Sequence, residues 1–116
     1  MQLRVFGRTG MQLSVLGFGC GAVGGFMVRG DAADQERTIA RAIAVGINYF
    51  DTAVQYGDGE SEKNLGRVLQ KLKPANAVVG SRTLVPMATL SGFSFCKTRP
   101  RFFSDSPSPY CTAVSK

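Results

Sequence analysis

The first eighty residues alternate between short apolar segments typical of strands and segments whose apolar residues recur at helical spacing. Residues 3–6 and 12–15 are strand-like and flank the glycine-containing segment 7–10, a pattern that predicts a short β-hairpin. Residues 16–19 (Leu-Gly-Phe-Gly) predict a further short strand that runs into a glycine-rich loop. We therefore expect three short strands before the first helix.

The first predicted helix has Ile39 and Ile43 one turn apart on its apolar face. Asp31 or Asp34 can cap its start, and Gly46 ends it.

The second predicted helix has apolar residues at the i, i+3, i+4 and i+7 positions of an amphipathic helix. Acidic residues near its start and lysines near its end suit the helix dipole, and Pro74 stops it. The residues concerned are Leu65, Val68, Leu69 and Leu72 on the apolar face, Glu60 and Glu62 at the start, and Lys71 and Lys73 at the end.

Residues 47–50 (Ile-Asn-Tyr-Phe) and 77–80 (Ala-Val-Val-Gly) predict two more buried strands. The predicted order is hairpin, strand, helix, strand, helix, strand. Such alternation predicts an α/β fold with parallel strands joined by right-handed crossovers.

After residue 80 the sequence changes character. Thirteen of the fourteen glycines lie in residues 1–80, whereas four of the five prolines follow them. Residues 83–95 follow neither period, and residues 97–116 have the Ser/Pro-rich composition of an exposed, irregular segment. We therefore place a boundary near residue 82, between a folded part (1–82) and a divergent basic tail (83–116).

The candidate chemistry lies where the second parallel strand ends. Asp51 follows the apolar strand and Tyr56 comes five residues later in the loop. Reactive groups gather at the carboxyl ends of parallel strands, so the two side chains are candidate catalytic residues. On position alone, Asp51 could equally cap its own turn while Tyr56 packs over the strand ends.

The motifs GFGCGAVGG (17–25), GINYFDTAVQYGDGESEKNLG (46–66) and AVVGS (77–81) resemble the opening third of an aldo-keto reductase, over about residues 1–82. The resemblance implies a (β/α)₈ TIM barrel that reduces aldehydes or ketones with NADPH, of which this chain holds the hairpin plus βαβαβ. It implies that Tyr56 is the proton donor and that Asp51 supports it. It also implies that Asp51 and the loop residues Gly19, Cys20 and Gly21 border the nicotinamide end of the cofactor.

The chemistry explains these residue types. Hydride addition builds negative charge on a carbonyl oxygen, which must be stabilised and protonated. A phenol is too weak an acid near neutrality unless a nearby cation lowers its pKa. The family supplies a lysine at the end of the third strand, whereas this sequence has Arg82, whose planar head places its donors differently. The family's histidine, from the fourth strand, has no counterpart because the sequence contains no histidine.

Residues 19–24 also match the dinucleotide fingerprint G-x-G-x-x-G. That fingerprint needs its third glycine inside a helix, whereas residues 25–30 (Gly-Phe-Met-Val-Arg-Gly) predict a loop. We therefore reject a Rossmann site. Without the resemblance, the glycines could simply permit tight strand packing, and Cys20 would be a small loop residue rather than a reactive thiol.

Composition bounds the remaining possibilities. The net charge of +6 comes mostly from residues 81–116, which hold five basic residues against one acidic residue. Three widely spaced cysteines form no metal pattern and suit a reducing cytoplasm, and no apolar run could span a membrane.

A complete barrel needs about 250 residues, so we expect this chain alone to show little catalysis and no tight NADPH binding. The alternative is a non-catalytic binding module. Its basic tail could contact an acidic surface, although nucleic acid is a weak candidate, and its open sheet edge could pair with a second copy.

Overall fold

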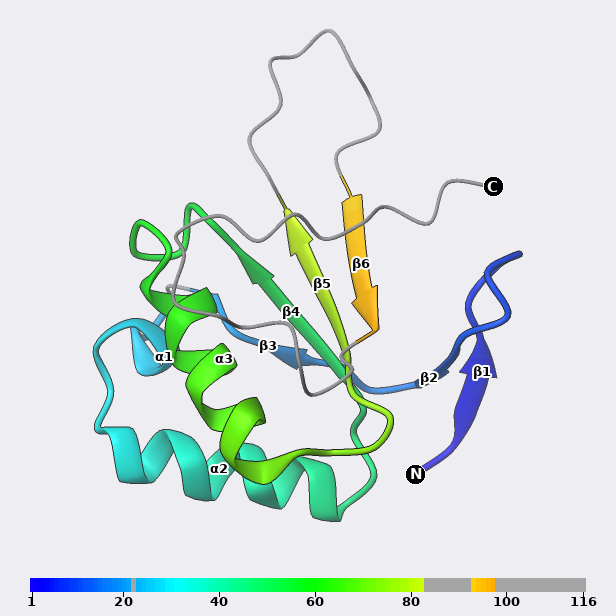
Figure 1. Cartoon of the computed structure of the whole chain (residues 1–116), viewed down its shortest axis with the longest axis horizontal. Coiled ribbons are helices and arrows are strands. Elements are labelled where there is room, and N and C mark those ends of the chain that lie inside the picture. The colour runs from blue at the N-terminus through cyan, green and yellow to red at the C-terminus, as the bar shows by residue number, and fades with distance from the viewer. Residues whose placement is uncertain (22, 83–92, 98–116) are drawn as a thin grey trace, which may run out of the picture.

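The computed structural model describes residues 1–21, 23–82 and 93–97, the last stretch as backbone alone. The elements along the chain are β1 (Leu3–Val5), β2 (Gln12–Ser14), β3 (Phe18–Gly19), α1 (Phe26–Arg29), α2 (Ala32–Ala44), β4 (Tyr49–Ala53), α3 (Glu60–Leu72), β5 (Val78–Arg82) and β6 (Phe93–Lys97) (Figure 1).

The strands form two sheets. β1 and β2 pair as an antiparallel hairpin, and the main sheet has the order β3-β4-β5-β6. β3, β4 and β5 are parallel, and α2 and α3 connect them as crossovers. The predicted hairpin followed by βαβαβ is therefore confirmed.

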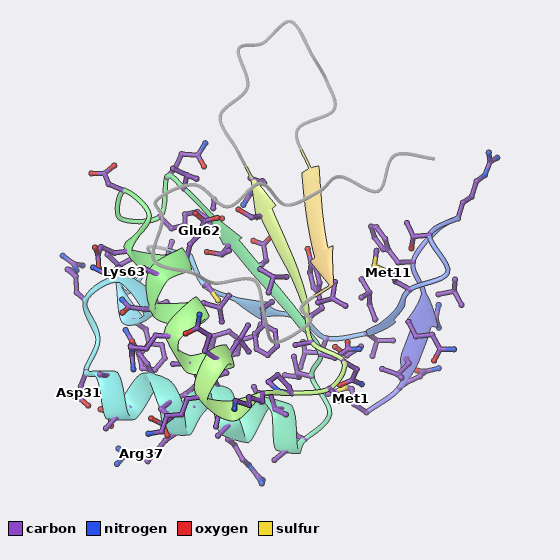
Figure 2. All side chains as sticks on the ribbon, in the orientation of Figure 1. Met1, Met11, Asp31, Arg37, Glu62 and Lys63 are labelled. Carbon is purple, nitrogen blue, oxygen red and sulfur yellow. The ribbon has the colours of Figure 1, made fainter. Side chains whose placement is uncertain are left out.

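The two long helices begin and end where the sequence predicts. The Asp31 side chain caps α2 by accepting hydrogen bonds from the backbone N–H groups of Ala33 and Asp34. Gly46, with a φ of 91°, ends that helix in a left-handed conformation that favours glycine. Figure 2 shows Asp31 at the start of α2 and Glu62 in the first turn of α3.

β4 lies further along the chain than the predicted strand 47–50. It starts at Tyr49 and ends at Ala53, so Asp51 lies inside the strand rather than after it. The reason is pairing on both sides: Asp51 is in register with Gly19 of β3 and with Gly80 of β5.

β6 is a strand that the sequence pattern does not predict, since we expected residues 83–116 to be irregular. It pairs antiparallel with β5 from Val78↔Lys97 to Arg82↔Phe93. An unpaired strand edge offers a row of backbone donors and acceptors, which β6 satisfies here. β6 therefore covers the edge of β5. Apart from Lys97, the segment 97–116 lies outside the described residues.

α1 corrects a second expectation, because residues 25–30 were predicted to be a loop. Phe26–Arg29 form one helical turn whose Met27 side chain is buried. Two side chains from other helices hold this turn: Gln35 Nε2 donates to the Phe26 carbonyl at 2.9 Å, and Asn64 Nδ2 donates to the Met27 carbonyl at 3.0 Å. A single turn is too short to show a period, so tertiary contacts decide it.

The core lies between the helices and one face of the main sheet, where side chains fill the space between the two layers (Figure 2). Phe50 is fully buried at its centre, and its ring centroid lies 6.1 Å from that of Phe18 on the neighbouring strand. The other buried members are Cys20, Met27, Ile39, Leu65, Val68, Leu69, Ala77 and Val79.

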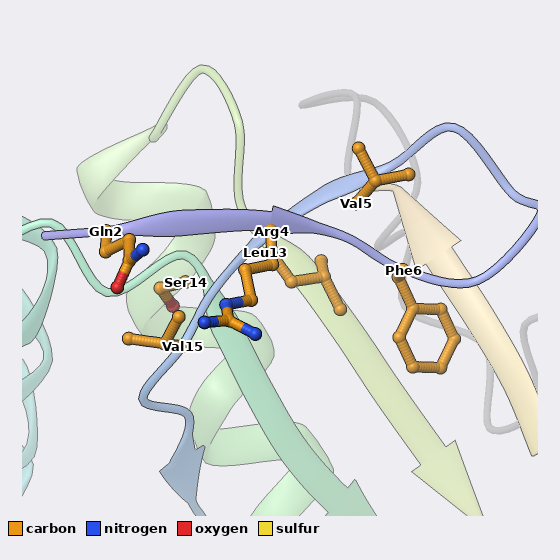
Figure 3. Close-up of a pocket in the computed structure, with 7 residues that line it drawn as sticks. All are labelled: Gln2, Arg4, Val5, Phe6, Leu13, Ser14 and Val15. Atoms are coloured by element: carbon orange, nitrogen blue, oxygen red, sulfur yellow. The ribbon is translucent and has the colours of Figure 1, made fainter.

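The hairpin is attached to the start of β4 by hydrogen bonds of two buried residues, Asn48 and Ser14, whose Oγ accepts from the Asn48 N–H at 3.1 Å. Asn48 Oδ1 accepts from the backbone N–H of Ser14 at 2.7 Å, and Asn48 Nδ2 donates to the Gln12 carbonyl at 2.9 Å. A groove of about 460 Å³ lies along this hairpin and is lined by residues such as Arg4, Phe6 and Leu13 (Figure 3).

Candidate active site

The structure brings together the three residues predicted to carry catalysis. Asp51 lies in β4, Tyr56 lies in the loop that follows, and Arg82 ends β5. Arg82 Nη2 lies 3.6 Å from Asp51 Oδ2 and donates a hydrogen bond to Tyr56 Oη. The guanidinium carbon of Arg82 also lies 5.8 Å from the centroid of the Tyr56 ring.

Strand geometry explains why these side chains meet. Successive residues of a strand point to opposite faces. Phe50 packs in the core and Ser81 donates to Glu62 of α3, so both point toward the helices. Asp51 and Arg82 therefore point to the opposite face, where register places them on adjacent strands near the carboxyl ends.

The loop between β4 and α3 holds Tyr56 through its backbone. The Tyr56 N–H donates to the Ala53 carbonyl at 3.0 Å, and the Tyr56 carbonyl accepts from the Ser61 N–H at 3.2 Å. The Tyr56 backbone is thus fixed between the end of β4 and the first turn of α3.

Two glycines lie where the loops around the site pack against other residues. A Cβ atom added at Gly21 would lie 3.8 Å from Tyr56 Cζ, so this loop residue lies against the ring. A Cβ atom at Gly57 would lie 2.3 Å from Val28 Cγ1, and Gly57 has a φ of 67°. Any other residue at position 57 would collide with α1 and adopt a strained backbone.

A chain of buried hydrogen bonds, here called the polar relay, lies on the helix side of the sheet, opposite the site. Thr52 Oγ1 lies 3.1 Å from Ser61 Oγ, and Ser61 Oγ donates to the Cys20 carbonyl at 2.7 Å. The Cys20 N–H in turn donates to the Asp51 carbonyl at 2.7 Å. This relay links β4, α3 and the glycine-rich loop. Thr52 and Ser61 are not among the site residues predicted from the sequence, although a polar residue inside a buried strand, such as Thr52, is a signal for such a role.

The loop residues predicted to border a cofactor separate into two groups. A Cβ atom at Gly19 would have no neighbour within 4 Å, and Gly19 pairs with Asp51, so it borders open space beside the site. The Cys20 side chain is fully buried in the core. Burial, and then the charge of Asp51, raise the pKa of the Cys20 thiol to about 12, as expected of an unreactive residue.

The rejected dinucleotide fingerprint fails on geometry. Gly24, its third glycine, has a φ of 75° and precedes α1 instead of lying inside a helix. The fingerprint also requires a long helix whose N-terminus binds the pyrophosphate, whereas α1 has only four residues.

Other classes of site find no support in the described part of the chain. Residues 1–21 and 23–82 contain no group of three side chains placed to hold a metal ion. Among the described helices, none has the length and apolar character needed to cross a bilayer.

The model of the aldo/keto reductase family matches residues 15–100. The chain belongs to the aldo/keto reductase family. The matched stretch extends past residue 82, the boundary that we predict from composition.

Curated relatives share the same region. The chain is 38% identical over 73 residues to L-galactose dehydrogenase of Arabidopsis thaliana and 37% identical over 79 residues to pyridoxal 4-dehydrogenase of Microbacterium luteolum. These alignments include 63% and 68% of this chain, which spans 23% of the length of either relative.

Solved structures show the same fold. The holo form of the aldo-keto reductase AKR11C1 from Bacillus halodurans matches with a TM-score of 0.59 at 26% identity, over 80% of this chain and 30% of the other. The glycerol dehydrogenase AKR11B4 from Gluconobacter oxydans matches with a TM-score of 0.54 at 34% identity, over 83% and 30%. The α/β arrangement described above is therefore part of a TIM barrel of this family, and the described sheet is not closed.

Proposed function

We propose that Asp51, Tyr56 and Arg82 form the proton-donating part of a nicotinamide-dependent oxidoreductase site that reduces an aldehyde or ketone with NADPH. The observation that carries this proposal is the contact of one guanidinium with both the Asp51 carboxylate and the Tyr56 phenol. Membership of the aldo/keto reductase family supports it.

The direction of the hydrogen bonds suits proton donation. Arginine has donors and no acceptor, so Tyr56 Oη accepts from Arg82, and the phenol's own hydrogen is left to donate to a substrate oxygen. The fixed charge of Arg82 can stabilise the phenolate as the proton leaves. The Asp51 carboxylate pairs with the same Arg82 nitrogen, Nη2, that donates to the phenol, so it acts on Tyr56 through Arg82.

The space beside these residues suits the nicotinamide end of a cofactor. Gly19 borders open space on the Asp51 side of the sheet, and Gly21 lies against the phenol, so a flat ring can approach Tyr56 without meeting a side chain from either glycine. When bound, the cofactor would supply the hydride. Gly19, Gly21 and Asp51 would border it, while Cys20 would contribute only the loop's shape.

We further propose that these 116 residues alone turn over little substrate and function in a reducing cytoplasm. The sequence has no histidine and spans 23% of the length of its curated relatives. The fully buried Cys20 is a free thiol, which suits that compartment.

A binding assay tests the site without requiring turnover. We would titrate the isotope-labelled chain with NADPH to millimolar concentration and follow backbone amide signals. We expect weak binding that shifts the signals of Gly19, Gly21 and Tyr56 and leaves those of the hairpin unchanged. Shifts confined to the hairpin groove, or no shifts, would contradict the proposed site.

A turnover assay tests the chemistry. NADPH oxidation with a generic aldehyde should stay near background, and any activity above it should fall by about 10²-fold or more in Tyr56→Phe. Robust turnover that depends on Tyr56 would support the oxidoreductase and refute the low activity of the chain alone. Robust turnover that survives Tyr56→Phe would refute the role of the phenol.

A further inference from the structure

A second phenol, Tyr49, lies on the same sheet face as the candidate site. It precedes Asp51 by two residues in β4, so both side chains point away from the helices. From the sequence, Tyr49 is predicted only as part of the strand 47–50, with no role in the site.

Two glycines leave room for the Tyr49 ring to lie across the sheet. A Cβ atom added at Gly17, which precedes β3, would lie 2.7 Å from Tyr49 Cδ1. A Cβ atom added at Gly80 in β5 would lie 2.6 Å from Tyr49 Oη and 3.2 Å from Cε2 and Cζ. One edge of the ring therefore covers Gly17, and its hydroxyl end covers Gly80.

The hydroxyl end faces the candidate site. Gly80 is the register partner of Asp51 and lies two residues before Arg82 on the same face of β5. The electrostatics agree, since burial and then the charge of Asp51 raise the pKa of Tyr49, while Arg82 lowers it. Both members of the ion pair therefore act on this phenol.

We propose that Tyr49 is a positioning residue. Its ring packs on Gly17 and Gly80, lies beneath the Asp51–Arg82 ion pair and keeps the Arg82 side chain in contact with Tyr56. Without the Tyr49 ring, Gly17 and Gly80 would leave empty space on this face, into which the long Arg82 side chain could fold away from the phenol. This inference rests on the site assigned under the proposed function and adds a residue to it.

The test measures the Arg82–Tyr56 contact directly by NMR in the full chain, using nuclear Overhauser effects between labelled side chains. Tyr49→Phe keeps the ring and should preserve the contact. Tyr49→Leu removes the ring, and Gly80→Ala places a methyl group against the Tyr49 hydroxyl, so both should weaken the contact. Val45→Ala at the end of α2 is the control, because Val45 is 40% exposed and lies outside the site, and it should leave the contact unchanged.

A second readout follows the ionisation of Tyr49 itself through its labelled phenol carbon. Asp51→Asn should lower the pKa of Tyr49, and Arg82→Gln should raise it. This readout needs no variant at Tyr49, so it holds even where Tyr49→Leu fails to fold.

The proposal is overturned if the Arg82–Tyr56 contact persists in the folded Tyr49→Leu and Gly80→Ala variants. It is also overturned if Asp51→Asn leaves the pKa of Tyr49 unchanged. Different results would contradict the proposed function. These are a missing Arg82–Tyr56 contact in the parent chain, or the absence of any NADPH effect on the glycine-rich loop, and neither depends on a substitution at Tyr49.

Discussion

β4 presents two different surfaces from one run of residues. Phe50 and Thr52 are buried against the helices, whereas Tyr49 and Asp51 are half-buried on the other face. The helix side is filled by apolar side chains that belong to one core cluster. The opposite side carries the charges of Asp51 and Arg82, and three of its strand or strand-flanking positions are glycine: Gly17, Gly19 and Gly80.

The difference teaches where stability and chemistry reside in this fold. Removing a helix-side group opens a cavity or leaves a buried polar group without a partner, and both are costly. Removing a site-side group alters charges that water already reaches. We therefore expect substitutions on the helix side to change the free energy of unfolding strongly, and those on the site side to change it little.

The sharpest test compares neighbouring residues of β4. Phe50→Ala removes a fully buried ring and should lower the free energy of unfolding by about 3–5 kcal/mol. Tyr49→Ala removes a ring of similar size from the half-exposed face and should cost clearly less. Urea unfolding followed by circular dichroism gives both values, and equal losses would contradict the contrast between the faces.

The second test uses pH to charge a helix-side group. The folded-state pKa of Cys20, about 12, lies above its ordinary value of 9.0, so the unfolded chain loses this proton first. The contribution to stability is therefore complete below pH 9 and is lost as the pH rises toward 12, by up to roughly 4 kcal/mol.

The control for this test is Cys20→Ala, which should remove most of the pH dependence. The raised pKa of Tyr49 leaves a smaller decline above pH 10, its ordinary value. Unfolding curves at a series of pH values from 8 to 11 check the slope. Identical slopes in the parent chain and Cys20→Ala would show that the thiol is not protected in solution.

The third test concerns the polar relay. Ser61→Ala leaves the Thr52 hydroxyl and the Cys20 carbonyl without this buried partner, so it should cost about 1–3 kcal/mol. The double substitution with Thr52→Val should cost less than the sum of the two single substitutions, because it removes both ends of one hydrogen bond. Strict additivity, measured by urea unfolding, would mean that the two hydroxyls do not interact.

These contrasts also explain how much of the fold could be predicted from the sequence. The helices α2 and α3 were predictable because period and capping are local properties: Asp31 caps one start, and Leu65 and Leu69 lie one turn apart in the other helix. The meeting of Asp51, Tyr56 and Arg82 was predictable because parallel strands end at one edge, and the family resemblance supplied their roles.

What the sequence did not reveal depends on contacts between distant residues. α1 is a single turn held by Gln35 and Asn64, and β6 is a strand because β5 offers an unpaired edge. The position of Tyr49 across two other strands follows from register and from missing side chains, neither of which a hydrophobic period encodes.

The smallest expected effect is the most direct test of the site side. Arg82 and Asp51 lie 3.6 Å apart with side chains 47% and 32% exposed, and ion pairs of such exposure contribute about 0–1 kcal/mol. Arg82→Met should therefore change the free energy of unfolding by less than about 1 kcal/mol, although it removes the only cation that contacts Tyr56 among the described residues.

Arg82→Lys is the matched control, because it keeps the charge and loses the planar head. Urea unfolding at low and high salt measures both variants, and the difference between them should shrink as salt screens the pair. A loss of several kcal/mol in Arg82→Met would mean that the pair stabilises the fold as the buried core does. The two faces of the sheet would then not be separable into one that holds the structure and one that holds the chemistry.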